Sequence, residues 1–589
     1  MHRSVNSAHH HHLSRPAAVL VAAAATIALA VGITAAGAST AHGAPAAGAK
    51  AGTPAPAAAP DPDGANGYKS IGYFPAWVPQ SGTYQVADLD RTGAVGDLTH
   101  LNYAFGNITS DLVCDESDAA GPEGPEGDPQ SDYLRLVSKK DSVDGVADKA
   151  TQPLAGNLNQ LRKLKERNPD LKVLISLGGW TWSDNFSDAV ATPESRARLV
   201  DSCVDLWIRG NLPVHGAQGG AGVAAGIFDG IDIDWEWPGA DGEHPSPRPE
   251  QDGENFIAFL QLLRTKLDAV GATTGEHYLI SGFAPAGWAP RTFGGWLDPR
   301  LVAVVDYLNV QGYDYHGTWV PNRTGHQGNL HKYYWPDDSQ NYANWGLAAD
   351  DLLAVYRAAG YRGDQINLGL AAYGQGWSGV TDPTPGAAAA APIGTRTYAQ
   401  LHDLGTEYYD ATAGAAYRWD GDQWFSLDTP RSVTGKAEWL AVNGYGGGFI
   451  WDITGDYKNE LAGALASTFR LATPGPLVTP SGAAPWYASG LYTAGDTVSH
   501  DGVEYVARWW TRGEEPGAAN GAWQATGPAG TTPPTAPSAC APAWDAAATY
   551  GKGDVVSRAG VNHTALWWTR GEAPGATAWG AWDAGAPCA

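Results

Sequence analysis

Eight short apolar runs that recur between residues 68 and 472 constrain the fold of this 589-residue chain more than any other feature. They are KSIGYFPAW, LTHLNYAFG, KVLISLGGW, FDGIDIDWEW, YLISGFAPAG, VVDYLNVQGYDY, INLGLAAYG and GGFIWDI. Amphipathic segments such as NLNQLRKLKERNP and ENFIAFLQLLRTKLDAV separate several of them. This alternation favours parallel β/α units, so we predict an α/β domain, a (β/α)8 TIM barrel over residues 68–472.

Polar residues gather where the runs end, as expected at the carboxyl-terminal end of a barrel. Asp234 and Glu236 lie near the end of the fourth run, Tyr313 and Asp314 near the end of the sixth, and Trp451 near the end of the eighth. About seventy residues separate the seventh run from the eighth, more than one helix needs. We therefore predict a small α+β insertion at about residues 378–428, which would raise one wall of a site.

The stretch FDGIDIDWEWPG carries Asp232, Asp234 and Glu236 at every second position. In a strand these three side chains point the same way. A solvated acidic face is the simpler alternative, but the flanking Ile, Trp and Phe residues indicate that both faces are covered. Crowding carboxylates in a buried place raises their pKa values into the range of a general acid.

The N-terminus is typical of a secretory signal. Arg3 and Arg15 precede an apolar run at residues 16–38, and small residues then allow cleavage after Ala38, Ala41 or Ala44. We predict a signal peptide at 1–41, an Ala/Pro/Gly-rich leader at 42–67, and a secreted, extracellular protein with no membrane contact after cleavage. The four histidines at 9–12 would leave with the signal.

Charge and cysteine usage limit the partners. The formal net charge of −25 argues against nucleic acid, which is bound through Lys and Arg, and suits a neutral substrate. Cys540 and Cys588 bracket one C-terminal segment and are expected to pair, and Cys114 with Cys203 follows only by elimination. Metal-ligand spacing is absent from the sequence, so we expect no metal and no other cofactor.

The tail contains an internal repeat. WYASGLYTAGDTVSHDGVEYVARWWTRGEEPG begins at Trp486 and WDAAATYGKGDVVSRAGVNHTALWWTRGEAPG at Trp544, an offset of 544 − 486 = 58 residues. We predict modules at 486–527 and 540–589 with linkers at 473–485 and 528–539. Adjacent Trp residues in a strand point to opposite faces, so one of each pair is expected on the surface, where it can stack on sugar.

These motifs together resemble the family 18 glycoside hydrolases. The run from Asp229 to Glu236 is similar to their DxxDxDxE signature, and SLGG, with Ser176, to their SxGG strand. QGYDY, with Gln311, resembles their [MQ]xYD strand, and Trp451 matches the aromatic floor of their site. The tail modules resemble small, all-β chitin-binding modules of carbohydrate-binding families 5 and 12.

The resemblance implies a retaining mechanism in which the substrate supplies its own nucleophile. Glu236 would be the general acid, Asp234 would orient the acetamido group, Asp232 would share a proton with Asp234, and Tyr313 and Asp314 would hold and distort the sugar. The implied substrate-binding residues are Trp451, Gln311, Tyr73, Phe105, Trp180, Trp235, Trp288, Tyr373 and Ser176. Those of the tail modules are Trp509, Trp510, Trp567, Trp568, Tyr492 and Tyr550. Further aromatic residues could extend a stacking floor or serve as ordinary core, namely Trp77, Trp182, Trp319 and Trp377.

The resemblance thus implies a secreted chitinase that acts on chitin and N-acetylglucosamine oligosaccharides, and we expect a monomer. One alternative is an endo-β-N-acetylglucosaminidase acting on N-glycans, which shares the signature. Another is a non-catalytic chitin-binding lectin, in which the last acid of the signature is typically lost. Glu236 is present here, which favours an enzyme.

Overall fold

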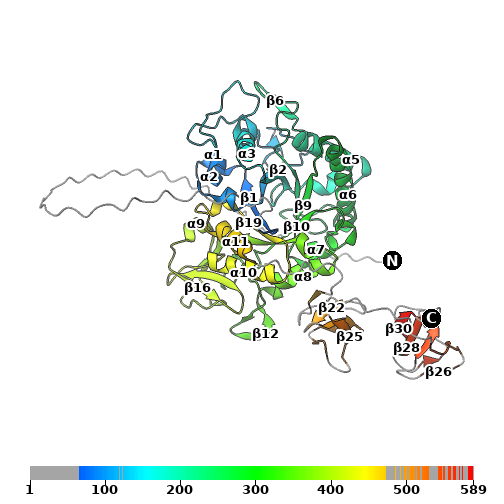
Figure 1. The fold of residues 1–589 in the computed structure, drawn as a ribbon. Coiled ribbons are helices and arrows are strands. Elements are labelled where there is room, and N and C mark those ends of the chain that lie inside the picture. Colours follow the sequence, from blue (N-terminus) through cyan, green and yellow to red (C-terminus); the bar gives the residue numbers. More distant parts are fainter. Residues whose placement is uncertain are drawn as a thin grey trace, which may run out of the picture. The chain divides into compact units, whose positions relative to one another are not determined.

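The computed structural model describes residues 66–118, 120–121, 124–472 and parts of 484–587 (Figure 1). The predicted signal peptide, almost all of the leader, and most of both linkers lie outside the described residues, as do Cys540 and Cys588.

The large domain is a closed barrel of eight parallel strands in the order β1-β19-β13-β10-β9-β8-β5-β2. The strands are β1 (Lys69–Pro75), β2 (His100–Gly106), β5 (Lys172–Gly178), β8 (Gly230–Asp234), β9 (Leu279–Ala284), β10 (Tyr307–Val310), β13 (Ile366–Ala371) and β19 (Gly447–Trp451). Each lies within one of the eight apolar runs, so the predicted barrel is confirmed. All five residues of β8 are buried, because helices cover the outside and side chains fill the inside.

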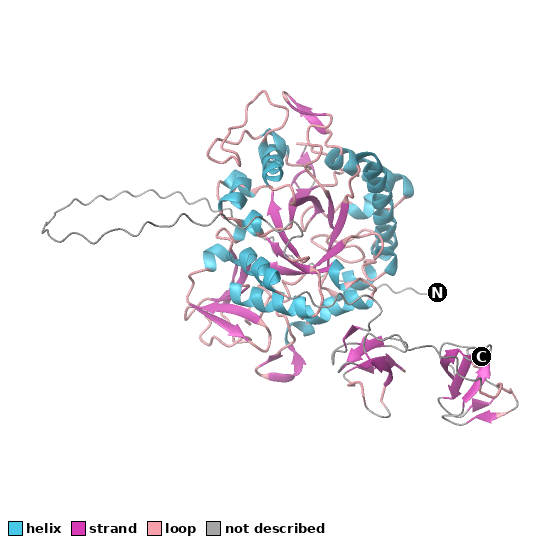
Figure 2. Cartoon of the chain, in the orientation of Figure 1, coloured by secondary structure: helices cyan, strands magenta, loops and turns pink. Residues whose placement is uncertain are grey.

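Helices surround the barrel (Figure 2). The longer ones are α3 (Gly156–Arg167), α5 (Pro193–Cys203), α6 (Pro249–Thr274), α8 (Ala349–Ala358), α10 (Pro430–Val442) and α11 (Glu460–Leu471), and the short ones are α1 (Val78–Ser81), α2 (Val86–Arg91), α4 (Phe186–Ala189), α7 (Trp288–Phe293) and α9 (Tyr398–Leu401). Helix α6 begins at a proline, carries Glu250 and Asp252 in its first turn, and ends at Gly275 in the left-handed conformation. Among the described helices, none has both the length and the apolar character that a bilayer span requires.

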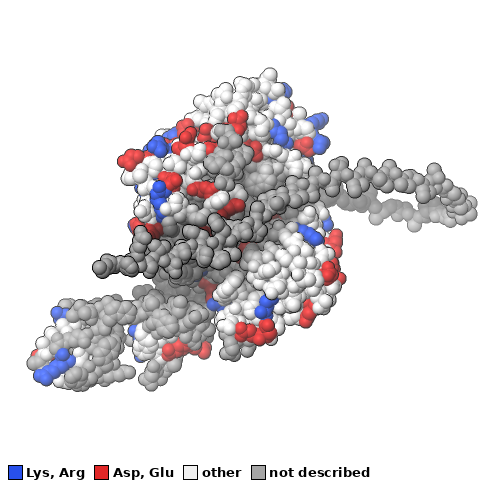
Figure 3. Space-filling model, turned by 180° about the vertical axis from the view of Figure 1, so that it is seen from behind, with Lys and Arg blue, Asp and Glu red and all other residues white. Residues whose placement is uncertain are grey.

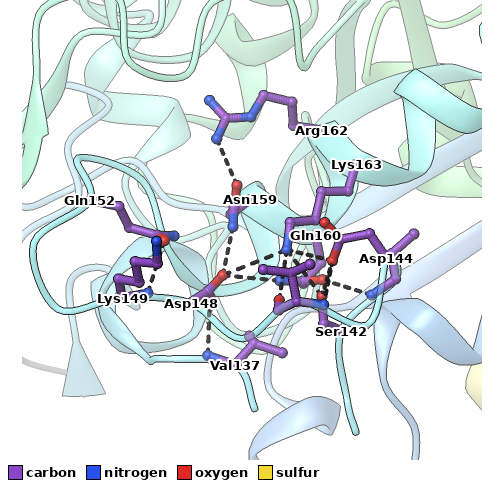
Figure 4. Close-up of polar contacts among 12 residues, drawn as sticks. Val137, Ser142, Asp144, Asp148, Lys149, Gln152, Asn159, Gln160, Arg162 and Lys163 are labelled. Carbon is purple, nitrogen blue, oxygen red and sulfur yellow. Dashed lines mark hydrogen bonds and ion pairs between the residues drawn. The ribbon is translucent and has the colours of Figure 1, made fainter. Parts of the chain in front are cut away.

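The long connection from β2 to α3 is fixed by a network of polar contacts (Figure 4). Asp148 accepts hydrogen bonds from the backbone N–H groups of Val137 (3.0 Å) and Gly156 (3.1 Å) and from Asn159 Nδ2 (2.6 Å). Lys163 on α3 forms an ion pair with Asp144 at 2.9 Å. The connection therefore has a defined shape although it contains little regular structure.

A disulfide between Cys114 and Cys203 joins the same connection to the end of α5, which confirms the pairing expected by elimination. Next to it lies a buried acidic pair. Glu116 and Asp132 are both almost fully buried, and burial raises the pKa values of both carboxyl groups.

The insertion between β13 and β19 is a five-stranded sheet with one short helix, α9. Its strands are β14 (Tyr373–Ser378), β15 (Ala391–Thr397), β16 (Thr406–Asp410), β17 (Ala415–Trp419) and β18 (Trp424–Leu427). The predicted α+β insertion is confirmed, but its sheet begins at Tyr373 rather than near 378. Trp377 is 0 % exposed, packs against Trp424, and donates Nε1–H to the Val320 carbonyl at 2.9 Å. Trp377 is therefore core of the insertion and no part of a sugar-stacking floor.

A hairpin of β11 (Tyr334–Trp335) and β12 (Asp338–Tyr342) rises from the connection between β10 and α8. Its Tyr333 and the following Ala343 pack with Ala413 and Ala415 of the insertion. The hairpin and the insertion thus form one continuous flank.

The described tail residues form two small all-β units. The first contains β20 (Ala484–Pro485), β21 (Leu491–Tyr492), β22 (Thr497–His500), β23 (Val503–Ala507), β24 (Thr511–Arg512) and β25 (Trp523–Pro528). The second contains β26 (Thr549–Tyr550), β27 (Val555–Arg558), β28 (Val561–Ala565), β29 (Thr569–Arg570) and β30 (Trp582–Pro587). Strands β26 to β29 repeat β21 to β24 at the same offset as the sequence repeat, for example 555 − 497 = 58.

Candidate active site

Asp232 is the most deeply buried member of a row of carboxylates that begins on β8. Its Oδ2 accepts hydrogen bonds from the hydroxyls of Tyr73 on β1 (2.9 Å) and Ser176 on β5 (2.8 Å), and its Oδ1 accepts one from Ser281 on β9 (2.5 Å). Burial raises the pKa of Asp232, and these hydroxyl donors oppose that rise because they stabilise the ionised form. The carboxylate is therefore held in one orientation by the two strands that adjoin β8, β5 and β9, and by β1 from across the barrel.

Asp234, two residues further along β8, is 4 % exposed, and its Oδ1 has no hydrogen-bond partner among the described residues. Its pKa is raised well above the usual range by burial first, and then by the charges of Glu236 and Asp232. A buried oxygen without a partner is costly unless another group completes it. Asp234 is thus poised to bind a proton or a hydrogen-bond donor from outside the protein.

Glu236 follows β8 and is partly exposed. Burial and the nearby Asp314 raise its pKa to about 8. Its backbone N–H donates to Ser183 Oγ at 2.8 Å, and Ser183 in turn donates to the Gly179 carbonyl at 2.8 Å. No hydrogen bond to the Glu236 carboxyl group occurs among the described residues, so this group is available to a substrate while its backbone is fixed.

Tyr313 and Asp314 come from the end of β10. The pKa of Tyr313 is raised by burial and then by the charges of Asp234 and Asp314, which keeps the hydroxyl protonated and able to donate. Asp314 has a left-handed backbone (φ 59°), and its Oδ1 accepts a hydrogen bond from Gln375 Nε2 at 2.9 Å. Burial raises the pKa of Asp314 as well. Strand β14 of the insertion therefore supports a residue of the site.

Aromatic side chains pack together beside these acids. Trp451, at the end of β19, stacks on Phe105 with ring centroids 5.6 Å apart and meets Tyr73 edge-on at 5.7 Å. Tyr373 meets Tyr313 edge-on at 6.0 Å. Trp451, Phe105 and Tyr373 are half-buried, so each keeps part of its ring open to a ligand.

Two adjoining cavities extend the site from Glu236 toward the loops after β1 and β2. The first, of about 330 Å³, is lined by Glu236, Trp237 and His244 among others. The second, of about 560 Å³, is lined by Trp77 and Phe105 among others. Both are also lined by Thr181 and Trp182, so together they form a groove of the kind that an elongated ligand needs.

The structure brings the five predicted catalytic residues together. Three of the predicted substrate-binding residues, however, are buried. Tyr73 and Ser176 are fully buried with their hydroxyls bonded to Asp232, so they support that acid. Trp235 is 2 % exposed and stacks on Phe186 at 5.2 Å in the outer core, because its side chain alternates with those of the acids on β8. Its ring is thus packed into the core, although the residue also borders the first cavity.

The other predicted residues lie in open or half-open positions. Gln311 is half-buried and its Oε1 accepts a hydrogen bond from the Ala286 backbone at 3.1 Å. Trp182 is also half-buried. The exposed candidates are Trp77, Trp180, Trp288 and Trp319.

The sequence analysis missed Ser281, Ser183 and Gln375. Each is a common polar residue outside the acidic signature, and each contacts the site through folding of distant segments. Gln375 carried one weak signal, since it lies two residues after Tyr373 and so shares its strand face.

The tail aromatics are only partly described. Trp509 is 47 % exposed, as expected for one member of a Trp pair. Tyr550 is half-buried, packs against the small core of its module, and accepts a hydrogen bond from the Asp545 backbone at 2.8 Å. Trp510, Trp567, Trp568 and the side chain of Tyr492 lie outside the described residues.

Comparison with known proteins agrees with this geometry. The model of glycosyl hydrolases family 18 matches residues 69–456, and that of carbohydrate-binding module family 5/12 matches residues 485–524, which covers most of the first tail module. Chitinase C of Streptomyces lividans is 34 % identical over 413 residues, which are 66 % of this chain and 57 % of that protein. Chitinase A1 of Niallia circulans is 32 % identical over 443 residues, which are 68 % of this chain and 58 % of that protein.

Among solved structures, the catalytic domain of psychrophilic chitinase B from Arthrobacter TAD20 superposes with a TM-score of 0.67 and 44 % identity, covering 70 % of this chain and 98 % of that one. The chain spans 57–60 % of the length of the first three curated relatives. Because the family model covers most of the barrel and includes every acid of the site, the chain belongs to family 18 of the glycosyl hydrolases.

Proposed function

We propose that the chain is a secreted chitinase that hydrolyses β-1,4 linkages between N-acetylglucosamine residues with retention of configuration. One observation carries the proposal: Asp234 has an unpartnered buried oxygen next to Glu236, whose pKa is raised to about 8. The names of the relatives, which are chitinases, and the aromatic groove support the same substrate.

In the first step the protonated Glu236 gives its proton to the glycosidic oxygen as the bond from that oxygen to the anomeric carbon breaks. The carbonyl oxygen of the 2-acetamido group of the same sugar forms a new bond to the anomeric carbon. Asp234 accepts the acetamido N–H, which turns the carbonyl toward the carbon and stabilises the positive charge of the oxazolinium intermediate. Asp232, beneath it, shares the proton of the carboxyl pair.

Tyr313 and Asp314 act on the sugar at the point of cleavage. The Tyr313 hydroxyl donates to the acetamido carbonyl oxygen and so favours its alignment. Asp314 binds the distorted ring and, through its charge, keeps Glu236 protonated before the reaction. Trp451 forms the floor on which the ring stacks.

In the second step Glu236, now a carboxylate, takes a proton from water while the water oxygen attacks the anomeric carbon. The bond between that carbon and the acetamido oxygen breaks, and the sugar leaves with its original configuration.

Replacing Glu236 by Gln tests the assignment. E236Q removes the proton donor but keeps the shape, so turnover of an N-acetylglucosamine oligomer should fall by at least about 10²-fold. E254Q is the matched control, because Glu254 is an exposed glutamate paired with Arg300 on the outside of the barrel. Turnover of E236Q near that of E254Q would refute the role of the acid.

A different substrate is needed to test whether the acetamido carbonyl of the sugar is the nucleophile. A fully deacetylated glucosamine polymer lacks the acetamido carbonyl, so it should not be cleaved by the wild-type chain. Cleavage of an N-glycan core in place of chitin oligomers would favour the endo-β-N-acetylglucosaminidase alternative.

A further inference from the structure

Trp345 is the most exposed aromatic side chain among the described residues, at 76 %. It lies directly after the β11–β12 hairpin, outside both cavities of the active-site groove. A single exposed apolar side chain is ordinary on a protein surface, so the meaning of this ring depends on its backbone and on the aromatic residues near it.

The backbone at this position is also unfavourable. Asn344 (φ 54°, ψ 37°) and Trp345 (φ 53°, ψ 23°) are both left-handed, and Gly346 follows with φ 77°. A left-handed L-residue costs about 1–2 kcal/mol, and for a bulky side chain it is rare. Such outliers gather at functional sites, where the surrounding structure holds them in place.

Asn344 holds the turn in place. It is 2 % exposed, and its Nδ2 donates to the His326 carbonyl at 2.7 Å and to Asn329 Oδ1 at 3.0 Å. The backbone N–H of Leu347 closes the turn by donating to the Asn344 carbonyl at 3.0 Å. Trp345 is therefore presented from a fixed base, which lowers the entropy that binding would lose.

A pair of stacked aromatic side chains lies on the preceding β11–β12 hairpin. Tyr334, 46 % exposed, stacks on Tyr342 with ring centroids 4.4 Å apart. The hairpin lies at the outer edge of the barrel domain (Figure 1), where it packs against the insertion.

Two cationic side chains on this flank are held in ion pairs, whereas Asp338 on β12 accepts hydrogen bonds from Asn341. Lys332 pairs with Asp351, and Arg323 pairs with Asp337. The face of the molecule opposite to that of Figure 1 carries both acidic and basic side chains among uncharged ones (Figure 3). A patch of aromatic rings with paired charges suits a neutral ligand that has apolar faces.

We propose that Trp345 and Tyr334 form a second polysaccharide-binding surface, which stacks on the pyranose faces of a chitin chain away from the groove. This inference rests on the proposed function for the identity of the polymer. A sugar is the occupant that the rest of the chain favours, because the tail module matched to a carbohydrate-binding family also presents a solvent-exposed tryptophan, Trp509. The rings would hold the barrel domain on an insoluble surface while the groove takes one chain.

The test uses the full-length chain with Trp345 replaced by Ala and, separately, by Gly. Gly adopts the left-handed conformation without strain, so W345G should unfold at the same temperature as the wild type or higher. Both variants should bind chitin particles about threefold to tenfold more weakly, the effect of losing one stacking side chain. Turnover of a soluble oligomer should not change.

V442A is the matched control, because Val442 is an equally exposed apolar residue on α10 without an aromatic ring. The same substitutions in a W509A chain should lower particle binding further, since two linked sites on one surface reinforce each other. Depletion from solution by chitin particles measures all of these effects.

Depletion of W345A and W345G equal to that of V442A would overturn the proposal. A wild-type dimer that W345A converts to a monomer in sedimentation would also overturn it, because the ring would then cover a second copy of the chain. Failure of the proposed function would appear differently: the wild type would not hydrolyse chitin oligomers, whereas the binding loss of W345A depends on no hydrolysis.

Discussion

The charge of a single residue, Asp314, sets part of the acidity of the catalytic centre. It follows β10, which is separated from β8 only by β9 in the barrel, and its charge raises the pKa of Glu236. The general acid must be protonated when substrate binds, so activity is present below the pKa of Glu236 and is lost as the pH rises through it.

Replacing Asp314 by Asn should therefore move the alkaline limb of kcat/KM to lower pH. The neutral amide no longer opposes ionisation of Glu236, whose pKa falls, so the protonated form disappears earlier. A pH–rate profile on a soluble oligomer measures the shift whatever the loss in absolute rate. D268N, an exposed change on α6, should leave the limb in place, and an unmoved limb in D314N would contradict the electrostatic link.

At this scale the sequence predicted the acids and missed their partners. Asp232, Asp234 and Glu236 were identifiable because a strand repeats every two residues. Ser281 and Gln375 were not, since a serine or glutamine gains meaning only when the fold brings it to a carboxylate. Trp235 was misassigned because its position in the signature suggested function, whereas strand alternation turns its ring outward into the core.

At the scale of elements, the Cys114–Cys203 disulfide ties the β2–α3 connection to α5 across 89 residues of sequence. A cross-link over a loop of this length restricts the unfolded chain strongly. The connection also lines the groove through Asp128 and Gln130, so its anchoring affects the site as well.

The double variant C114S/C203S should lose about 2–4 kcal/mol of unfolding free energy. The β2–α3 connection keeps its Asp148 contacts, so turnover of a soluble oligomer at 25 °C should stay close to wild type. Calorimetry of the barrel transition provides the comparison, and reductant-treated wild type should resemble the variant. An unchanged transition in both would show that the cross-link adds no stability.

The elements themselves were predictable to different degrees. The eight barrel strands could be predicted, because each is buried on both faces and its sequence is an unbroken apolar run. The start of the insertion was not, because β14 follows β13 after a single residue, Ala372, and two adjoining strands look like one apolar stretch. The role of Trp377 was ambiguous for a different reason, because the sequence alone does not distinguish a buried aromatic ring from an exposed one.

At the scale of the whole molecule, the chain combines a barrel with a groove and two small all-β units. The first unit matches a carbohydrate-binding family, and the second repeats its strand pattern. We expect both to hold the enzyme on insoluble substrate and to take no part in bond breaking.

A chain that ends after Ala472 should keep its turnover of soluble oligomers, because every residue of the site lies before that position. It should bind chitin particles much more weakly than the full-length chain. Depletion by particles and turnover of a soluble oligomer, measured on the same preparations, separate the two effects. Equal depletion of both chains would show that the tail has another role.

The hydrogen bonds of Asp232 have a consequence for how such a chain can change. Tyr73, Ser176 and Ser281 bring three other strands to this one carboxylate, and Asn309 of β10 donates to the Tyr73 hydroxyl at 3.1 Å. Asp232 therefore connects several strands of the closed barrel through hydrogen bonds, and selection for folding alone would preserve it. Glu236 has no such structural duty among the described residues. A descendant that abandoned hydrolysis could discard Glu236 freely while keeping Asp232, so of the two acids only Glu236 reports whether catalysis is still under selection.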